Sequence, residues 1–207
     1  MQKTLITSAL ALALGAAAMP AFAQSAGDWT LGVGVHAVDP KSDNGSLVDG
    51  ALKVDVDTDV KPTLTFEYFV RDNLGIEVIA AWPFEHDISI DGLGTVGSTK
   101  QLPPTVSLQY HFNSKSKVSP FIGAGVNYTT FFSEDTRGAL EGSRLKLDDS
   151  WGLAAHAGID FAVGERSAIR VDARWIDIDT DVKLDGAGIG TVNIDPIVYG
   201  AAYVMKF

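Results

Sequence analysis

The sequence predicts an all-β fold, an eight-stranded antiparallel transmembrane β-barrel. Three observations lead to this prediction: apolar and polar residues alternate along eight stretches, tight turns alternate with long connections, and aromatic residues gather at the ends of the stretches. Alternation with a period of two over about ten residues is typical of strands with one apolar and one polar face. An even number of such strands fits a closed antiparallel barrel.

The N-terminus has the pattern of a secretory signal peptide. Lys3 precedes an apolar run, and the triplet Ala21-Phe22-Ala23 follows that run. A basic start, an apolar centre and a small-residue cleavage site are the three parts of such a peptide. We therefore expect residues 1–23 to be removed on export and residues 24–207 to form the barrel.

The composition excludes several classes of protein. The formal net charge of -10 leaves no basic surface for nucleic acid, and the chain has no cysteine for a disulfide, a thiol nucleophile or a thiolate metal site. After residue 23, no segment approaches the ~18 consecutive apolar residues of a membrane-spanning helix. A membrane protein of this composition must therefore cross with strands.

Each predicted strand carries its apolar residues on every second position. In chain order, the apolar sides run over Trp29 to Ala37, Leu64 to Val70, Leu74 to Trp82, Val106 to Phe112, Ile122 to Tyr128, Trp151 to Phe161, Ile169 to Trp175 and Tyr199 to Phe207. In a transmembrane barrel these sides face lipid and the intervening polar sides face the lumen.

The connections between the stretches alternate in length. Three are tight turns, at residues 71–73, 113–117 and 164–167, and four are long, at residues 39–61, 85–103, 133–149 and 177–193. Short periplasmic turns and long external loops are the arrangement of barrels in the bacterial outer membrane. We therefore expect both termini at the periplasmic end and this localisation for the protein.

This topology places the aromatic residues in two belts. Seven are expected near the periplasmic interface and five near the outer one: Trp29, Tyr68, Tyr110, Phe112, Phe161, Tyr203 and Phe207, and Trp82, Tyr128, Phe132, Trp151 and Trp175. Belts of this kind mark the two interfaces of a membrane barrel. A soluble β-sandwich with an aromatic core is the alternative, and it would not place aromatic residues at strand ends on the outward face.

The polar faces of the lower strands predict an ion-paired lumen floor. Its seven residues are Glu67, Glu77, His156, Asp160, Arg170, Asp172 and Arg174. The interior of an eight-stranded barrel is just wide enough for side chains or one small ligand. Charges crowded into this space are expected to pair and fill it, which argues against a continuous aqueous pore.

The upper part of the lumen is expected to be apolar. Beyond Trp175 the apolar residues change from odd to even numbers, while Asp179 and Asp181 take odd positions. Above the membrane the outside of a barrel is wet, so the apolar side belongs inside. The predicted apolar lumen consists of Ile79, Ala81, Phe131, Ile176, Ile178, Ile194 and Val198. An alternative is that the loop hydrophobic residues merely pack beneath one another.

Three prolines suggest where a ligand leaves such a lumen. Pro83 and the pair Pro103-Pro104 flank the second long connection, at the tops of the third and fourth strands. Because proline cannot donate to a strand ladder, it marks edges and breaks. A lateral opening is therefore expected there, although the same prolines also fit ordinary strand ends.

The spacing of serine, histidine and acidic residues does not indicate a catalytic or metal-binding function. Ser107, Ser150, His36, His111 and His156 all have inward parity, and no Ser/His/Asp set converges at strand spacing. No histidines stand at ligand spacing, and the strings Asp55–Asp59 and Asp177–Asp181 lack the glycine and distal glutamate of an EF-hand loop. We expect no enzyme activity, no catalytic residue, no metal site and no cofactor.

Six motifs occur in order along the chain: "DNLGIE" from Asp72, "AAWPFEH" from Ala80, "LPPT" from Leu102, "GAGVNYTTFF" from Gly123, "DSWG" from Asp149 and "DIDT" from Asp177. Together they resemble the outer membrane protein W family, which includes alkane-uptake porin-like proteins. The resemblance implies an eight-stranded barrel that admits small hydrophobic molecules and releases them sideways into the bilayer. It also implies large apolar residues on the third and seventh strands. Ile79 fits that pattern, whereas Arg174 departs from it and favours an ion-paired floor.

The chain ends on "YVMKF", whose apolar side ends at Phe207. This ending resembles the C-terminal signal of bacterial outer-membrane proteins, which implies recognition by the barrel-assembly machinery. The expected partners are this machinery, outer-membrane lipid and a small hydrophobic ligand, and no nucleic acid. The alternative function is a structural or receptor/adhesion barrel without transport.

Overall fold

The computed structural model describes residues 22–207. Residues 1–21 of the predicted signal peptide lie outside the described part. Over residues 22–207, the protein has no helix with the length and apolar character needed to cross a bilayer.

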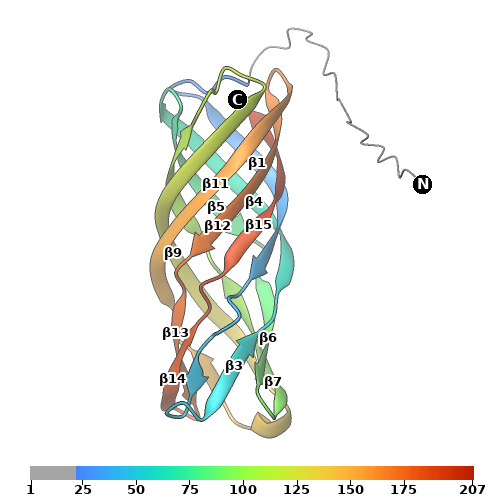
Figure 1. The fold of residues 1–207 in the computed structure, drawn as a ribbon, viewed down its shortest axis with the longest axis vertical. Helices are drawn as coiled ribbons and strands as arrows, with labels where there is room; N and C mark the ends of the chain where they lie inside the picture. Colours follow the sequence, from blue (N-terminus) through green and yellow to red (C-terminus); the bar gives the residue numbers. More distant parts are fainter. Residues whose placement is uncertain (1–21) are drawn as a thin grey trace, which may run out of the picture.

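Eight antiparallel strands close into a barrel, which confirms the predicted fold class (Figure 1). Each strand pairs with its neighbours in the chain-order circuit, and pairing of the first with the last closes it. The strands are β1 (Trp29–Asp39), β4 (Asp59–Arg71), β5 (Leu74–Ala81), β8 (Thr105–His111), β9 (Val118–Thr136), β11 (Ser150–Gly164), β12 (Ser167–Ile176) and β15 (Ile197–Lys206). Closure pairs the strand edges that would otherwise face lipid, except beyond Ile79 and Thr105, where the β5–β8 ladder ends.

The last strand closes the barrel in full register with the first. Leu31 lies opposite Met205, and Val33 lies opposite Tyr203. Phe207 extends the pairing, because its backbone N–H donates to the Trp29 carbonyl at 2.9 Å. The two aromatic rings stack at 4.3 Å between centroids. The C-terminal residues thus complete the wall, with Tyr203 and Phe207 on its exposed outer face.

The tight turns use residues that tolerate a left-handed backbone. Asn73 has φ of 65° between β4 and β5, and Asn113 has φ of 54° between β8 and β9. Asparagine adopts this conformation more readily than other residues with a Cβ. The sequence therefore encodes sharp reversals at this end of the barrel.

The four long connections are themselves largely β-structure and extend the barrel at the end opposite the C-terminus (Figure 1). They contain β2 (Ser46–Leu47), β3 (Leu52–Val56), β6 (Phe84–Ile90), β7 (Gly94–Leu102), the 3-10 helix η1 (Gly138–Leu140), β10 (Leu145–Leu147), β13 (Asp179–Leu184) and β14 (Ala187–Asn193). β3, β6 and β7 pair side by side next to β9, and β10, β13 and β14 form a second sheet. We call this part the extension.

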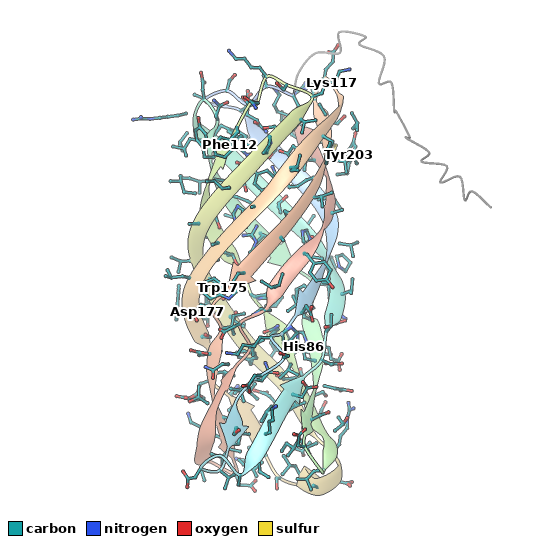
Figure 2. All side chains as sticks on the ribbon, in the orientation of Figure 1. His86, Phe112, Lys117, Trp175, Asp177 and Tyr203 are labelled. Carbon is teal, nitrogen blue, oxygen red and sulfur yellow. The ribbon has the colours of Figure 1, made fainter. Side chains whose placement is uncertain are left out.

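The outer wall is apolar between two sets of aromatic residues. In Figure 2, Phe112 and Tyr203 lie near the end that carries the C-terminus, and Trp175 lies where the barrel meets the extension. Trp82 and Trp151 are 64% and 73% exposed, which is unusual for tryptophan except where it faces lipid. Inside the wall, the buried residues of the strands are mostly polar. This inverted pattern is that of a barrel in the outer membrane.

Candidate functional site: the barrel lumen

All seven residues of the predicted floor point into the lumen. Each is at most 7% exposed, although six of them carry a formal charge when ionised and the seventh is an imidazole. They come from β4, β5, β11 and β12, whose inward positions alternate with the lipid-facing ones: Glu67, Glu77, His156, Asp160, Arg170, Asp172 and Arg174.

Arg170 is the centre of this floor. Its Nε donates to Asp160 Oδ1 at 2.8 Å, and its Nη1 donates to Glu77 Oε2 at 2.8 Å. Nη2 lies 3.4 Å from Glu67 Oε2. The guanidinium carbon also stands 4.5 Å from the centroid of the Phe121 ring. One cation therefore joins three carboxylates from three strands and rests on an aromatic face.

Arg174 lies two residues further along β12 and shares one carboxylate with Arg170. Its Nη2 donates to Glu77 Oε1 at 2.6 Å, and its Nη1 lies 3.4 Å from Ser107 Oγ. Glu77 thus accepts from both guanidinium groups. A buried carboxylate with two such partners is held ionised and fixed in position.

The histidines extend the network around the barrel. His111 Nε2 lies 2.9 Å from Glu67 Oε1, and His36 Nε2 lies 3.1 Å from Asp172 Oδ1. His156 Nε2 donates to the side-chain oxygen of Gln109 at 2.7 Å. The network therefore crosses the lumen at this level and contains side chains of β4, β5, β8, β9, β11 and β12, while the separate His36–Asp172 pair joins β1 to β12.

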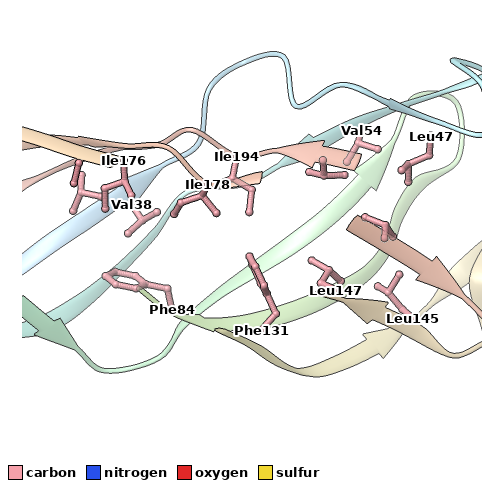
Figure 3. Close-up of a cluster of buried hydrophobic side chains, with 14 residues drawn as sticks. Val38, Leu47, Val54, Phe84, Phe131, Leu145, Leu147, Ile176, Ile178 and Ile194 are labelled. Atoms are coloured by element: carbon pink, nitrogen blue, oxygen red, sulfur yellow. The ribbon is translucent and has the colours of Figure 1, made fainter. Parts of the chain in front are cut away.

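The upper lumen is built from apolar side chains (Figure 3). Of the residues predicted there, Phe131, Ile176, Ile178, Ile194 and Val198 belong to one buried cluster, against which Ala81 packs. Ile79 is 7% exposed and lines the small cavity below this cluster. The apolar residues predicted from the sequence therefore lie close to one another, and side chains of the extension such as Leu47 and Leu145 pack with them.

Along β12 and β13 the inward residues change from charged to apolar, although even-numbered residues face the lumen throughout. Arg170, Arg174, Ile176, Ile178 and Val182 are all buried, so even-numbered residues face inward throughout. What changes is the solvent on the outer side. Below Trp175 the wall meets lipid, and beyond it Asp179 and Asp181 are exposed to water.

Three buried residues of the upper lumen have a parity that the sequence pattern does not predict. In β5 the inward residues are odd-numbered, but Phe84 and His86 in β6 are buried at even positions. Pro83 separates the two strands and reverses the face. Similarly, Val54 is buried whereas Val60 is exposed, because residues 57 and 58 interrupt the strand between them. A proline or a turn inside an alternating stretch is the signal that parity can change.

The lumen contains two narrow cavities. The larger, of about 80 Å³, lies in the extension among apolar residues such as Val54, Phe131 and Ile194. The smaller, of about 20 Å³, lies where the apolar cluster meets the floor and is lined by Phe84, Arg174 and their neighbours. Among the described residues 22–207, these two cavities offer space for ligand atoms within an otherwise closely packed apolar cluster.

The prolines stand beside a break in the wall. The β5–β8 ladder ends at the pair Ile79 and Thr105, and the β6–β7 ladder begins at Phe84 and Gln101. Over the described residues 22–207, no ladder pair joins the four residues 80–83 to the three residues 102–104. Each side stays attached to its other neighbour, since Trp82 N–H donates to Pro62 O and Tyr128 N–H donates to Pro104 O.

The smaller cavity borders this break, which we call the wall gap (residues 80–83 and 102–104). Ala81 and Pro103 line the cavity from the two sides of the gap. Ala80, whose position faces outward, also borders it. The inner space and the lipid-facing surface therefore meet here at two segments that each pair with their other neighbour but not with one another.

His86 connects the first two external connections. Its Nδ1 donates to the Asp57 carbonyl at 2.7 Å, while its Nε2 accepts from Gln101 Nε2 at 2.9 Å. Nearby, Asp87 N–H donates to Asp57 Oδ1 at 2.6 Å. Burial lowers the pKa of His86 below its usual range, which favours the neutral imidazole that this pair of hydrogen bonds needs.

One of the acidic strings contributes to a carboxylate cluster. Carboxylate oxygens of Asp177, Asp179 and Asp195 lie within 4.8 Å of one another. Lys41 Nζ pairs with Asp195 Oδ2 at 2.7 Å, and Asn193 Nδ2 donates to Asp179 Oδ1. Protein donors therefore already occupy part of this cluster.

Comparison with known proteins gives the family. The model of the OmpW family matches residues 25–207. The chain belongs to the OmpW family. Outer membrane protein W of Vibrio cholerae serotype O1 is 36% identical over 100% of both chains. The crystal structure of the outer membrane protein OprG from Pseudomonas aeruginosa superposes with a TM-score of 0.80 and 37% identity, over 89% of this chain and 97% of that one.

These comparisons place this OmpW-family barrel in the bacterial outer membrane, as predicted. A further relative is the dibenzothiophene metabolism operon protein PahQ of Pseudomonas aeruginosa. It is 30% identical over 68% of this chain and 66% of its own length.

Proposed function

We propose that the barrel admits small hydrophobic molecules through the apolar upper lumen and releases them through the wall gap into the bilayer. The observation that carries this proposal is the position of the gap. The ladder breaks at the level where the apolar cluster ends and the ion-paired floor begins. A molecule stopped by the floor therefore stands directly beside the interrupted wall.

The floor supports the lateral route on energetic grounds. Passage to the periplasmic end requires displacement of Arg170 from Asp160, Glu77 and Glu67. Separating a buried charge from its partners costs about 3–5 kcal/mol, and an apolar molecule makes no ion pair or hydrogen bond that would offset this cost. At the gap, no backbone hydrogen bond has to be broken, because the two proline-containing segments do not pair with each other. The sideways path is therefore the easier one.

The chemistry of a relative's operon agrees with an apolar ligand. PahQ takes its name from dibenzothiophene metabolism, and dibenzothiophene is a fused aromatic compound with little polarity. A lumen lined by Ile178, Ile194 and Phe131 suits ligands of this class.

Cross-linking across the gap tests the proposal. The chain has no cysteine, so Ala81→Cys together with Pro103→Cys gives one reactive pair facing the same cavity. A linker that contains a disulfide should reduce uptake of a small aromatic hydrocarbon by cells to the level of cells without the barrel. Reduction of the linker should restore uptake. The same variant capped with two single maleimide groups controls for bulk, and unchanged uptake in the cross-linked protein would remove the lateral route.

A structural or receptor/adhesion barrel is the second candidate, and close packing of the apolar cluster favours it. Phe84 and Ile178 are 1% and 0% exposed, as in an ordinary protein core. In that case the wild-type barrel would give no uptake above the barrel-free background, and the cross-link would be irrelevant.

A further inference from the structure

Arg174 stands at the boundary between the ion-paired floor and the apolar lumen. It is 2% exposed, and its two terminal nitrogens are directed to Glu77 and Ser107. Its Nε–H is buried and has no hydrogen-bond partner among residues 22–207. Because a buried unsatisfied donor on a charged group is costly, such a group is usually explained by a partner that binds there.

The cavity that Arg174 lines is otherwise apolar or already satisfied. Val38, Ile79, Phe84, Ile176 and Val198 form most of its wall. The Thr63 hydroxyl is bonded to His36 Nδ1 at 2.6 Å, and the Thr105 hydroxyl donates to Pro103 O at 3.2 Å. Arg174 Nε is therefore the donor without a partner among the described lining residues, and a cavity of about 20 Å³ holds one oxygen-sized group. Nε itself is covered by its neighbours, so a ligand oxygen reaches it when the Arg174 side chain turns toward the cavity.

The charge balance selects the kind of oxygen. Glu77 already neutralises Arg174, and the four floor carboxylates outnumber the two guanidinium groups when the imidazoles are neutral. A ligand carboxylate would therefore enter surroundings of its own sign. A ketone, ester or ether oxygen accepts the same hydrogen bond without this repulsion.

We propose that Arg174 selects, among small hydrophobic molecules, those with one neutral acceptor oxygen, and binds that oxygen through Nε–H. The apolar body of the ligand then lies against Ile79 and Phe84, toward the wall gap. This inference rests on the proposed function and specifies the class of ligand for the same lumen.

A matched pair of variants tests Arg174 as the donor. Glu77→Gln keeps Arg174 and its Nε, while the double variant Arg174→Met with Glu77→Gln removes the donor without leaving Glu77 as an unpaired charge. Binding of 2-decanone, decane and decanoate to the purified barrel is measured by competition. Ratios between the two variants cancel the partitioning of each probe into detergent.

The double variant should bind 2-decanone on the order of tenfold more weakly than Glu77→Gln, the size of one hydrogen bond to a charged donor. Decane should bind both variants equally, and wild type should prefer 2-decanone to decanoate. Equal losses for 2-decanone and decane would show a purely structural role for Arg174 and overturn the inference. Unchanged 2-decanone binding would overturn it too, because a water molecule then satisfies Nε.

The same measurement separates the two proposals. If the wild-type barrel binds decane but the double variant shows no selective loss of 2-decanone binding, the proposed function is retained and the role of Arg174 is removed. Wild-type barrel that binds none of the three probes contradicts both.

Discussion

The two halves of the lumen are built in opposite ways, even where the same face of one strand continues from one half into the other. On β12 the inward residues Arg170 and Arg174 belong to an ion-pair network, and two residues later Ile176 begins a hydrophobic core. The difference follows from the surroundings of the wall. Where lipid covers the outside, the inside can be polar, and where water covers the outside, the inside supplies the core.

The lower half of the barrel and the extension are stabilised by different interactions. In the lower half the barrel is held by ladder hydrogen bonds and by charges whose partners are all fixed by neighbouring strands. In the extension, short strands are held by apolar burial, as in a soluble domain. An apolar residue in the floor and a charged residue in the apolar lumen should therefore both lower the free energy of unfolding.

The largest effect is expected from Arg170→Met. The change leaves Glu67, Glu77 and Asp160 without their shared cation, so the free energy of unfolding should fall by about 3–5 kcal/mol. Denaturant unfolding of the barrel in lipid vesicles measures this loss.

Arg137→Met is the matched control for a lost cation. Arg137 forms an exposed pair with Asp87 at 3.5 Å, which should contribute less than about 1 kcal/mol. Equal stability of Arg170→Met and Arg137→Met would show that the floor is not held together by its charges.

A smaller, local effect is expected from Ile178→Asp. The side chain is fully buried in the apolar cluster, so an unpaired carboxylate should destabilise the extension by at least about 2 kcal/mol and lower hydrophobic uptake. Hydrogen exchange of β13 and β14 reports the local loss. Asp179→Asn, on the exposed side of the same strand, should change neither exchange nor uptake, and normal uptake by Ile178→Asp would count against the apolar lumen.

The smallest effect is expected from pH, at the contact between His86 and Asp57. Because burial lowers the pKa of His86 in the folded state, its contribution is fully present above the unfolded value near 6.5 and is lost as pH falls below it. Asp57, whose pKa is raised by burial, changes stability in the opposite direction. After correction for intrinsic exchange rates, the protection of the Asp57 and Asp87 amides should therefore fall several-fold from pH 7.5 to pH 5.5.

The variant His86→Gln isolates the imidazole, because Asp57 remains. Its amide exchange, corrected for intrinsic rates, should lose the pH dependence. A pH dependence that persists in His86→Gln would assign the effect to another group.

The sequence was sufficient to predict the barrel. It also predicts which residues of the floor and of the apolar lumen point inward, because a period of two assigns each side chain to one face of a continuous strand, and those residues are buried in the structure except for the half-buried Ala81. It failed where the strand is interrupted. Phe84 and Val54 are inside although their parity indicates the outside, since Pro83 in one case and residues 57 and 58 in the other reverse the face. Which carboxylate each arginine contacts, and the unsatisfied Nε of Arg174, depend on side-chain geometry across the lumen. No pattern along the chain contains that information.

The most direct test of the account is to photolabel the lumen with a diazirine-bearing hydrocarbon in lipid vesicles and to locate the adducts by mass spectrometry. Comparison with a labelled lipid of the same photochemistry identifies the wall residues that any membrane probe reaches. If the apolar lumen opens sideways, hydrocarbon-specific adducts should form on Ile79, Phe84 and Pro103, around the small cavity and the wall gap, and none on Glu67 or Asp160 in the floor. Adducts on the floor residues, or a pattern identical to that of the lipid probe, would contradict an apolar lumen that opens sideways above a closed floor.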